Sequence, residues 1–460
     1  MNTISYLVIL WSYLLFLMQL GYAMHCAGSV RAKNLILANV VAMAGGLFFY
    51  LFGFPFAFGD GSSSVTLFSL VRNNNNTIDD DEYSYDYVSF FLLQWAFAIT
   101  AAGITSGSVP MTTRFGSHLV ISFSISGVVY PVVARWVWSS DGWLSPSSTE
   151  LLFGSGAIDF GGGGLVSLVG GIAGMLGSMI GGRRGVMDPF RKYSRKALPR
   201  VGDRAMMVVL GLLLLWFGWF WFNPDYWFSK VFEAYASTTN QGTTWIILSR
   251  TAAVVAVASL IAGVVTVLGQ RFVVGHWDEL DACIGVIGGV VAISSGCSVV
   301  EPWAAVVCGV LAACLLVGLN VLALKLHFND TLEATQLYGG CGAWGLVFTG
   351  LFAKKELVIQ AYNHSGDSSV SRPFGLLMGG GWGLLGAQVI ELLVIVGWVS
   401  VTTGPLFYFL HKLRILGTSV DDEITSLDYD SYCGGCAYIQ SRENHVRYYG
   451  DYTRMQDEQC

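Results

Sequence analysis

The chain has 460 residues, of which 53% are hydrophobic and only 12% are charged, and its net charge is −6. Soluble domains carry about a quarter charged residues, so the composition excludes an ordinary soluble protein, and the small negative charge gives no reason to expect nucleic acid as a partner. Apolar runs of about 20 residues, long enough to cross a bilayer, recur along the chain. They predict an all-α integral membrane protein with about eleven transmembrane helices, over residues 5–25, 36–58, 88–109, 117–137, 151–181, 206–222, 244–268, 282–299, 303–325, 334–353 and 375–410.

The distribution of Lys and Arg between the loops predicts the orientation in the membrane. The loop after the fifth span, GGRRGVMDPFRKYSRKALPRVGDR, is densely basic, whereas the loop after the second span contains the acidic run NNNNTIDDDEYSYDY. We therefore expect an N-terminus outside, a transmembrane domain over 1–410 and a cytoplasmic tail over 411–460. Separately from this pattern, we expect the plasma membrane as the host. Asn75 and Asn363 begin N-x-S/T sequons on the outer side and are candidate glycosylation sites.

The chain contains a weak internal repeat. The fifth span reads DFGGGGLVSLVGGIAGMLG and the tenth reads LEATQLYGGCGAWGLVFTG, so each places an acid before a glycine-rich stretch. With five spans in each half, the two halves would have opposite orientations, as in inverted-repeat transporters. The final long helix would follow them. The two glycine-rich spans are the ones we least expect to be straight helices.

Charged side chains inside membrane helices are costly and are therefore functional candidates. Asp159 opens the fifth span, where it could hold a cation by its field or cap backbone amides, and the sequence leaves both open. For Glu391 in the eleventh span, a polar contact between helices is favoured over a proton relay. Arg250 starts the seventh span and could extend to the lipid headgroups.

Aromatic side chains cluster at the outer end of the fourth span, in Trp136, Trp138 and Trp143. Most such residues belong to an interfacial belt, but one at a pore mouth could hold a cation over its ring. Phe97 and Phe222 could form a hydrophobic gate, although packing in the core is the more common role of such residues.

The sequence contains no P-loop, no HExxH and no nucleophile elbow, so we expect neither an enzyme nor a cofactor. Cys433 and Cys436 form a C-x-x-C pair in the tail. Without a second pair of ligands, this spacing is a weak indication of a metal site, and we expect no metal.

Five segments spread along the chain match one known family. They are MQLGYAMHCAGSVRAKN, SGAIDFGGGG, LLWFGWFWFNP, LEATQLYGGCGAWGLVFTGLF and GWVSVTTGPLFYFLHKL. These segments resemble the ammonium transporter (Amt/Mep/Rh) family, and most closely its plant high-affinity type. The resemblance implies eleven helices in two inverted halves, ammonium or ammonia as the substrate, and a homotrimer in the lipid bilayer with one pore per subunit. It also implies recruitment of ammonium at an outer aromatic site, deprotonation, and passage through an apolar pore lined by two histidines.

The resemblance also assigns roles to individual residues. Trp143 matches the outer tryptophan that holds a cation, and Asp159 matches the aspartate that supports it. Phe97 and Phe222 match the stacked phenylalanine gate. Ser294 stands where the family has a Thr-type polar residue near the pore.

This chain departs from the family pattern inside the pore. Ser167 and Tyr338 replace the two histidines, Tyr226 replaces the outer serine, and Arg135 replaces a histidine before the fourth-span tryptophan. Imidazole titrates near neutral pH, whereas serine does not, and the pKa of tyrosine is about 10. Tyr338 is also bulkier than histidine and could fill the lumen or bridge to Ser167. A proton relay through this pair should be weakened or lost.

Two hypotheses follow from these departures. In the first, the chain is a working transporter of ammonium or a related small cation, with altered selectivity or a different proton route. In the second, it is a non-conducting sensor, or a regulatory subunit of a mixed trimer with related chains. The retained Trp143 and Asp159 agree with both hypotheses, and the lost histidines and Tyr226 favour the second. The resemblance to the family favours the first, so we predict transport, with the sensor or regulatory subunit as the alternative.

The tail resembles the cytoplasmic tail of the family, whose Gly-Gly-x-Ala-Tyr segment docks on the neighbouring subunit. Gly434, Gly435 and Tyr438 match that segment. The regulatory threonine of the family falls on Asp430 or Ser431. Aspartate there would replace a switchable phosphate by a permanent charge, whereas serine would keep the switch.

Overall fold

The computed structural model describes residues 3–29, 42–59, 80–109, 113–181, 206–220, 241–275, 277, 279–326, 328, 330, 332–362 and 372–416. All regular structure in these residues is helical. Six of the helices are long and apolar enough to cross a membrane, and shorter apolar helices occupy Ala42–Phe58, Met206–Phe220 and Leu280–Ser294. The predicted all-α membrane fold is therefore confirmed.

The helices of the first half follow the predicted spans. They are α1 (Thr3–Ser29), Ala42–Phe58 with η1 (Phe49–Gly53) and α3 (Phe54–Phe58), α4 (Asp80–Ser108), the run α5 (Phe115–Ser124), η2 (Ile125–Val129) and α6 (Tyr130–Val137), the 3-10 turn η3 (Leu152–Gly154), and η4 (Gly163–Leu168) continued by α7 (Val169–Gly181).

The second half repeats this pattern and is followed by one long helix. Its elements are Met206–Phe220, α10 (Gln241–Val274), α11 (Glu279–Ser294), α12 (Pro302–Lys325), η6 (Thr335–Gly340) continued by α13 (Cys341–Phe352), and the short α14 (Lys355–Tyr362). The 3-10 turn η7 (Leu376–Met378) and the long helix α15 (Trp382–Lys412) come after this half.

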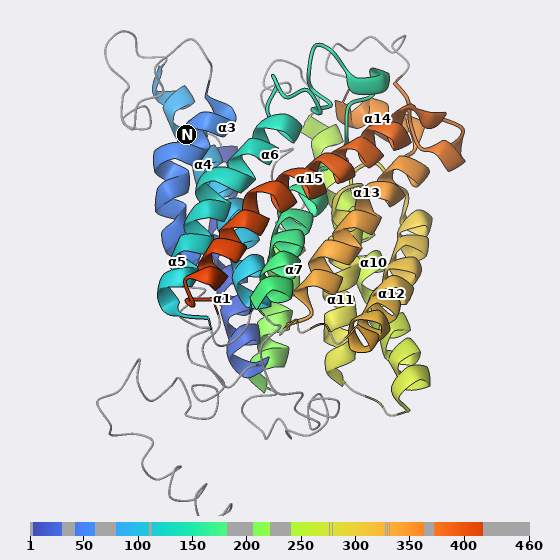
Figure 1. The fold of residues 1–460 in the computed structure, drawn as a ribbon. Helices are drawn as coiled ribbons and strands as arrows, with labels where there is room; N and C mark the ends of the chain where they lie inside the picture. The colour runs from blue at the N-terminus through green and yellow to red at the C-terminus, as the bar shows by residue number, and fades with distance from the viewer. Residues whose placement is uncertain are drawn as a thin grey trace, which may run out of the picture.

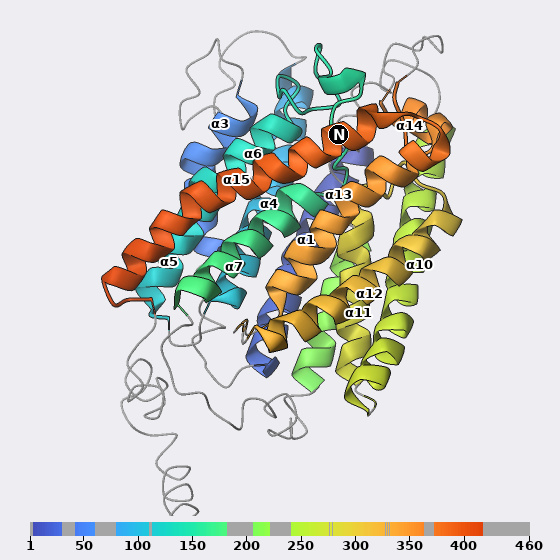
Figure 2. The ribbon, with the colours of Figure 1, turned by 45° about the vertical axis from the view of Figure 1, so that its right-hand side comes forward.

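The helix α15 runs diagonally across the bundle (Figure 1 and Figure 2), where it packs against α7 and α13. It begins near α14 and ends beside α5. The chain starts at the end of the bundle that also holds α3, α6 and α14. We call this the α14 end, and the opposite end the α5 end.

The two glycine-rich spans both begin as π-helices and cross each other, which confirms that they are not straight α-helices. The first, η4, packs against α13, and the second, η6, packs against α7. A β-carbon on Gly171 would collide with the backbone of Gly339, so glycine is needed where the two segments cross. Each π-helix thus packs against the α-helix that continues the other one. This reciprocal packing is the arrangement expected of two inverted five-helix halves.

An aspartate caps each of these π-helices. Asp159 Oδ2 accepts hydrogen bonds from Gly164 N at 3.0 Å and from Leu165 N at 2.8 Å. In the second half, Asp330 Oδ2 accepts one from Thr335 N at 2.7 Å. The cap proposed for Asp159 from the sequence is thus present.

In the tenth span, however, the sequence pointed to the wrong acid. The repeat was aligned on Glu333, which has a left-handed backbone with φ of 56°. Asp330, a few residues earlier, is the acid that caps η6. Ser167 follows Asp159 by the same number of positions as Tyr338 follows Asp330, so the aspartates are the equivalent residues of the two halves.

The fifth helix begins at Gly163 and not near residue 151, because residues 155–162 are irregular. Hydrogen bonds to distant backbone hold this segment, from Ala157 N to Leu144 O at 2.7 Å and from Phe160 N to Ser295 O at 3.0 Å. Hydropathy alone cannot separate such a buried segment from a helix, since both are apolar. The eleventh helix likewise begins at Trp382 and not near residue 375.

Candidate functional site

Three tryptophans form a cluster at the α14 end of the bundle. The ring of Trp143 lies edge-on to Trp136 with centroids 6.4 Å apart, and Trp136 lies edge-on to Trp398 of α15 at 5.5 Å. Trp143 is 44% exposed. It is therefore the predicted site residue whose ring is available to a cation that approaches from this end.

Trp138 joins two other predicted site residues beneath that cluster. Its Nε1 donates a hydrogen bond to the backbone oxygen of Asp159 at 2.7 Å, and its ring lies 5.2 Å from that of Phe97. All three side chains are at most 3% exposed. The sequence grouped Trp138 with the interfacial belt. Its spacing of four residues from Ala134 and eight from Tyr130, both buried, was the signal that it faces inward.

Tyr338 and Ser294 are connected through a second tryptophan. The ring of Tyr338 stacks on Trp219, with centroids 6.0 Å apart and an interplanar angle of 19°, and lies edge-on to Tyr22 at 6.4 Å. Trp219 Nε1 donates a hydrogen bond to Ser294 Oγ at 3.3 Å. Neither Trp219 nor Tyr22 was predicted from the sequence to belong to the site.

The bridge considered between Tyr338 and Ser167 does not form. Ser167 Oγ has no hydrogen-bond partner among the described residues, because the Tyr338 ring is stacked on Trp219. Ser167 is 0% exposed and Tyr338 is 2% exposed. Both side chains therefore lie in packed protein rather than along a water-filled channel.

The contacts of two charged residues, Arg250 and Glu391, differ from those expected from the sequence. Arg250 does not extend to the headgroups, because it donates hydrogen bonds to Gln360 Oε1 at 3.1 Å and to the backbone oxygen of Ser298 at 3.0 Å. Glu391 makes no hydrogen bond to another helix among those that the structure describes. Neither of its carboxylate oxygens has a hydrogen-bond partner in the described part of the chain, although the residue is fully buried.

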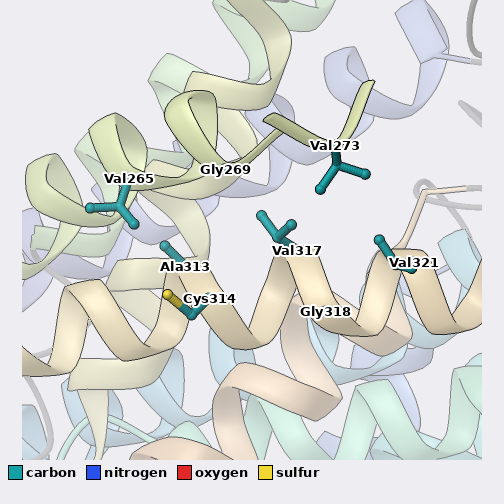
Figure 3. Close-up of a pocket in the computed structure, with 8 residues that line it drawn as sticks. All are labelled: Val265, Gly269, Val273, Ala313, Cys314, Val317, Gly318 and Val321. Atoms are coloured by element: carbon teal, nitrogen blue, oxygen red, sulfur yellow. The ribbon is translucent and has the colours of Figure 1, made fainter. Parts of the chain in front are cut away.

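No group of three or more metal-binding side chains occurs among the described residues. A hollow of about 400 Å³ lies away from the predicted site, between α10 and α12 (Figure 3), and its lining is apolar. It is lined by Val265, Gly269, Val273, Ala313, Cys314, Val317, Gly318 and Val321. The predicted positions outside the described residues are Phe222, Tyr226, Asn75, Asn363, Asp430, Ser431, Cys433, Gly434, Gly435, Cys436 and Tyr438.

Comparisons of the sequence with known proteins all match one family. The family described as "Ammonium Transporter Family" matches residues 6–438. Ammonium transporter 1 member 3 of Solanum lycopersicum is 57% identical over 99% of this chain and 98% of that protein. Ammonium transporter 1 member 4 of Arabidopsis thaliana is 50% identical over 92% of this chain and 82% of that protein.

Solved structures share the fold. Mep2 of Saccharomyces cerevisiae superposes with a TM-score of 0.73 at 23% identity, and the alignment covers 95% of this chain and 92% of that one. A structure described as "Sensor Amt Protein" gives a TM-score of 0.71 at 23% identity, with 94% and 98% covered. At this level of identity the likeness concerns the fold alone.

Proposed function

Because this chain belongs to the ammonium transporter family, we propose that it carries ammonium, or a related small cation, across a membrane. The observation that carries the proposal is the family match from residue 6 to residue 438, which includes all but the first few residues of the transmembrane region. The named relatives are transporters, and we propose no enzymatic activity, cofactor or metal for this chain.

In this proposal, ammonium is recruited at the α14 end, which faces outward. Trp143 offers an exposed ring for cation–π attraction, and Asp159 lies deeper, linked to Trp138 by a hydrogen bond. Phe97 and Phe222 form the gate below. Tyr226 borders the recruitment site in place of the family serine.

Ser167 and Tyr338 then stand where the family has its pore histidines, with Ser294 beside them. Neither hydroxyl can carry a proton at neutral pH as imidazole does. Conduction in this chain would therefore need another proton route, or would move the ammonium ion itself.

The assembly we propose is a homotrimer, or a mixed trimer with related subunits, in the plasma membrane. The N-terminus and the glycosylated Asn75 and Asn363 would lie outside, and the tail inside. Residues Gly434, Gly435 and Tyr438 would dock on the neighbouring subunit, under the control of a charge at Asp430 or a phosphate at Ser431.

The alternative is a non-conducting sensor or a regulatory subunit. The Tyr338–Trp219 stack and the complete burial of Ser167 favour it, because both residues are packed at the level where a lumen would pass. In this case ammonium would still bind near Trp143 but would not cross.

Uptake of ammonium and methylammonium in cells without their own transporters separates the two. The natural chain would be compared with the double variant Ser167→His/Tyr338→His, at equal surface expression. Saturable uptake by the natural chain, at a rate within about tenfold of the double variant, is the expected result. Tyr408→His, at an exposed position of α15, controls for the introduction of a histidine.

A natural chain that reaches the surface but moves no ammonium, alongside an active double variant, would contradict transport and support the sensor. Binding measured with labelled methylammonium on the purified protein would then show whether the Trp143 site is still occupied.

A further inference from the structure

Glu391 is a buried carboxyl group with no role in the proposed transport path. It lies in the first third of α15, it is 0% exposed, and neither of its oxygens has a hydrogen-bond partner among the described residues. An ionised carboxylate in such a place is costly unless a proton or a cation neutralises it. The Glu391 carboxyl group therefore needs a bound proton or a cation.

A second carboxylate faces it across Gly164. A β-carbon on Gly164 would stand 3.2 Å from Glu391 Oε1 and 3.2 Å from Asp159 Oδ2. Glu391 Oε1 and Asp159 Oδ2 are thus separated by at most twice 3.2 Å. Asp159 Oδ1, the oxygen that does not cap η4, also has no hydrogen-bond partner in the described part of the chain.

The approach of the two acids is fixed by the packing of α15. One turn before Glu391, the side-chain amide of Gln388 pairs with both backbone groups of Ile158. It accepts a hydrogen bond from Ile158 N at 2.9 Å and donates one to Ile158 O at 2.7 Å. Because Ile158 directly precedes Asp159, these bonds set α15 in register with the second carboxylate.

Few charges surround the pair. Asp159 is the only charged group among the described residues that acts on Glu391, and the thiol of Cys297 faces Asp159. The elements packed most closely on α15 are η2, η3, η4, η7, α7 and α13. Their only ionisable side chain is the thiol of Cys341 in α13, so these elements supply no cation.

A further polar group points into the same space. The hydroxyl of Ser295 is 0% exposed, faces the Asp159 carboxylate, and would collide with a β-carbon on Gly163. It meets no acceptor with ordinary hydrogen-bond geometry among the described residues, yet it lies close enough to Asp159 to favour the charged form of that carboxylate. Glu391 has no such donor among the described residues.

We propose that Asp159 and Glu391 form a shared one-proton site, in which Glu391 carries the proton at neutral pH and Asp159 carries the charge. Two carboxylates this close in a region of low dielectric cannot both stay ionised without a counter-ion, and no basic side chain in the described part of the chain supplies one to Glu391. Asp159 keeps its charge because two backbone amides donate to it.

The site puts a titratable carboxyl group beside Asp159 in a chain whose histidine positions are Ser167 and Tyr338. Its use in transport rests on the proposed function, but the protonation itself does not. The two can therefore fail separately.

Infrared spectroscopy of the purified full chain in lipid nanodiscs tests the protonation, with no ammonium present. A protonated carboxyl group has a carbonyl stretch that a carboxylate lacks. We expect this band at neutral pH in the natural chain, its loss in Glu391→Gln, and its retention in Glu356→Gln. Glu356 is the matched control because its side chain is 69% exposed.

The coupling between the two acids has its own readout. In Asp159→Asn, Glu391 loses its negative neighbour, so its band should disappear at a lower pH than the band of the natural chain. Asparagine keeps an oxygen that can cap η4, and size-exclusion chromatography would confirm that the variant is folded.

An unchanged spectrum in Glu391→Gln at neutral pH would overturn the proposal, since Glu391 would then be ionised. A band that titrates at the same pH with and without Asp159 would also overturn it, because Glu391 would then titrate alone. Neither outcome depends on transport.

The role in transport is measured by methylammonium uptake against external pH. We expect Glu391→Gln to shift the pH profile, and Glu356→Gln to leave it in place. A Glu391→Gln profile that coincides with that of the natural chain would remove the pair from the transport path. A natural chain with no uptake would instead contradict the proposed function, while the spectra would still decide the protonation.

Discussion

At the scale of single residues, the site depends on positions where no side chain fits. Gly164 separates the carboxylates of Asp159 and Glu391, and a β-carbon there would also lie 3.0 Å from Leu346 Cδ1. Such distances are shorter than ordinary contacts, so the neighbours would have to move. A glycine in a transmembrane helix is common, and the sequence alone did not distinguish this one from its neighbours.

We predict that Gly164→Ala lowers the free energy of unfolding by about 1–3 kcal/mol, the usual cost of an overpacked core. The apparent melting temperature of the purified protein in detergent would measure it. Gly397→Ala on α15 is the matched control, because a β-carbon there meets nothing within 4 Å. Alanine is the better helix former, so the control should be neutral or slightly stabilised. Equal melting temperatures for the two variants would contradict the crowding at Gly164.

Single residues also show how far the sequence predicts the site. Trp143, Asp159 and Phe97 were found from their resemblance to a family pattern, and the structure links Asp159 and Phe97 through Trp138. Trp138 itself was missed, because its place near the end of a span was given more weight than its four-residue spacing from Ala134, which is buried. The role of Trp219 depends on the ring of Tyr338, which is far from it in the chain.

At the scale of elements, an ion pair fastens the beginning of α12 to the link between α13 and α14. Lys354 Nζ lies 2.6 Å from Glu301 Oε1, and Trp303 Nε1 donates to Glu301 Oε2 at 2.8 Å. Hydrogen bonds from Lys354 and then from Trp303 lower the pKa of Glu301 below its ordinary value. Since both charged side chains are about one-third exposed, the contribution of the pair to stability is small.

The lowered pKa gives a pH dependence of definite sign. The folded chain binds the Glu301 proton more weakly than the unfolded chain, so the stabilisation is present at neutral pH and is lost as pH falls through the folded pKa. We predict that Lys354→Met melts at a lower temperature than the natural chain at pH 7. This difference in melting temperature should shrink below a pH of about 4, which is close to the ordinary pKa of a glutamate side chain.

Lys355→Met is the control, because the neighbouring Lys355 is exposed. It should melt like the natural chain across the whole pH range. A difference for Lys354→Met that stayed constant into acid would show that its origin is not the charge of Glu301.

The elements themselves were predicted well where local sequence determines them. The runs of apolar residues located the helices, and the glycine-rich stretches were expected to deviate from straight helices. The start of the fifth helix was wrong because distant groups hold the preceding segment, including Gln388 and the backbone of Ser295. Such hydrogen bonds join residues far apart in the chain, so no local pattern reports them.

At the scale of the whole molecule, the apolar hollow between α10 and α12 bears on assembly. Its lining is almost entirely apolar, and both helices carry exposed large side chains, among them Leu260, Val264 and Leu311. A surface of this kind is covered either by lipid or by another subunit. The proposed trimer makes the second of these an expectation that can be measured.

We predict that Val317→Trp, which fills the hollow, lowers the fraction of trimer by at least about threefold. Native mass measurement in mild detergent would give this fraction. Val401→Trp on α15 is the control, because Val401 is 71% exposed and lies outside the hollow, and both changes are apolar and tolerated by lipid. If both variants kept the same trimer fraction, lipid and not a subunit would cover the hollow.

The inverted arrangement of the two halves shows both the reach and the limit of the sequence. Two glycine-rich strings were enough to predict it, because a close crossing of helices requires glycine, as at Gly171, where a β-carbon would collide with the backbone of Gly339. The alignment of the acids was nevertheless shifted from Asp330 to Glu333. Only the capping hydrogen bond to Thr335 identifies the equivalent residue.

The helix α15 is held at both of its ends. Near its start, Gln388 is bonded to Ile158, and just beyond its last residue Ile415 O accepts hydrogen bonds from Arg114 N and from Ser117 Oγ. A rod fixed at two points cannot slide along its axis without releasing both. A force applied to the tail would therefore reach the α14 end as a twist about the axis of α15 and not as a sliding movement.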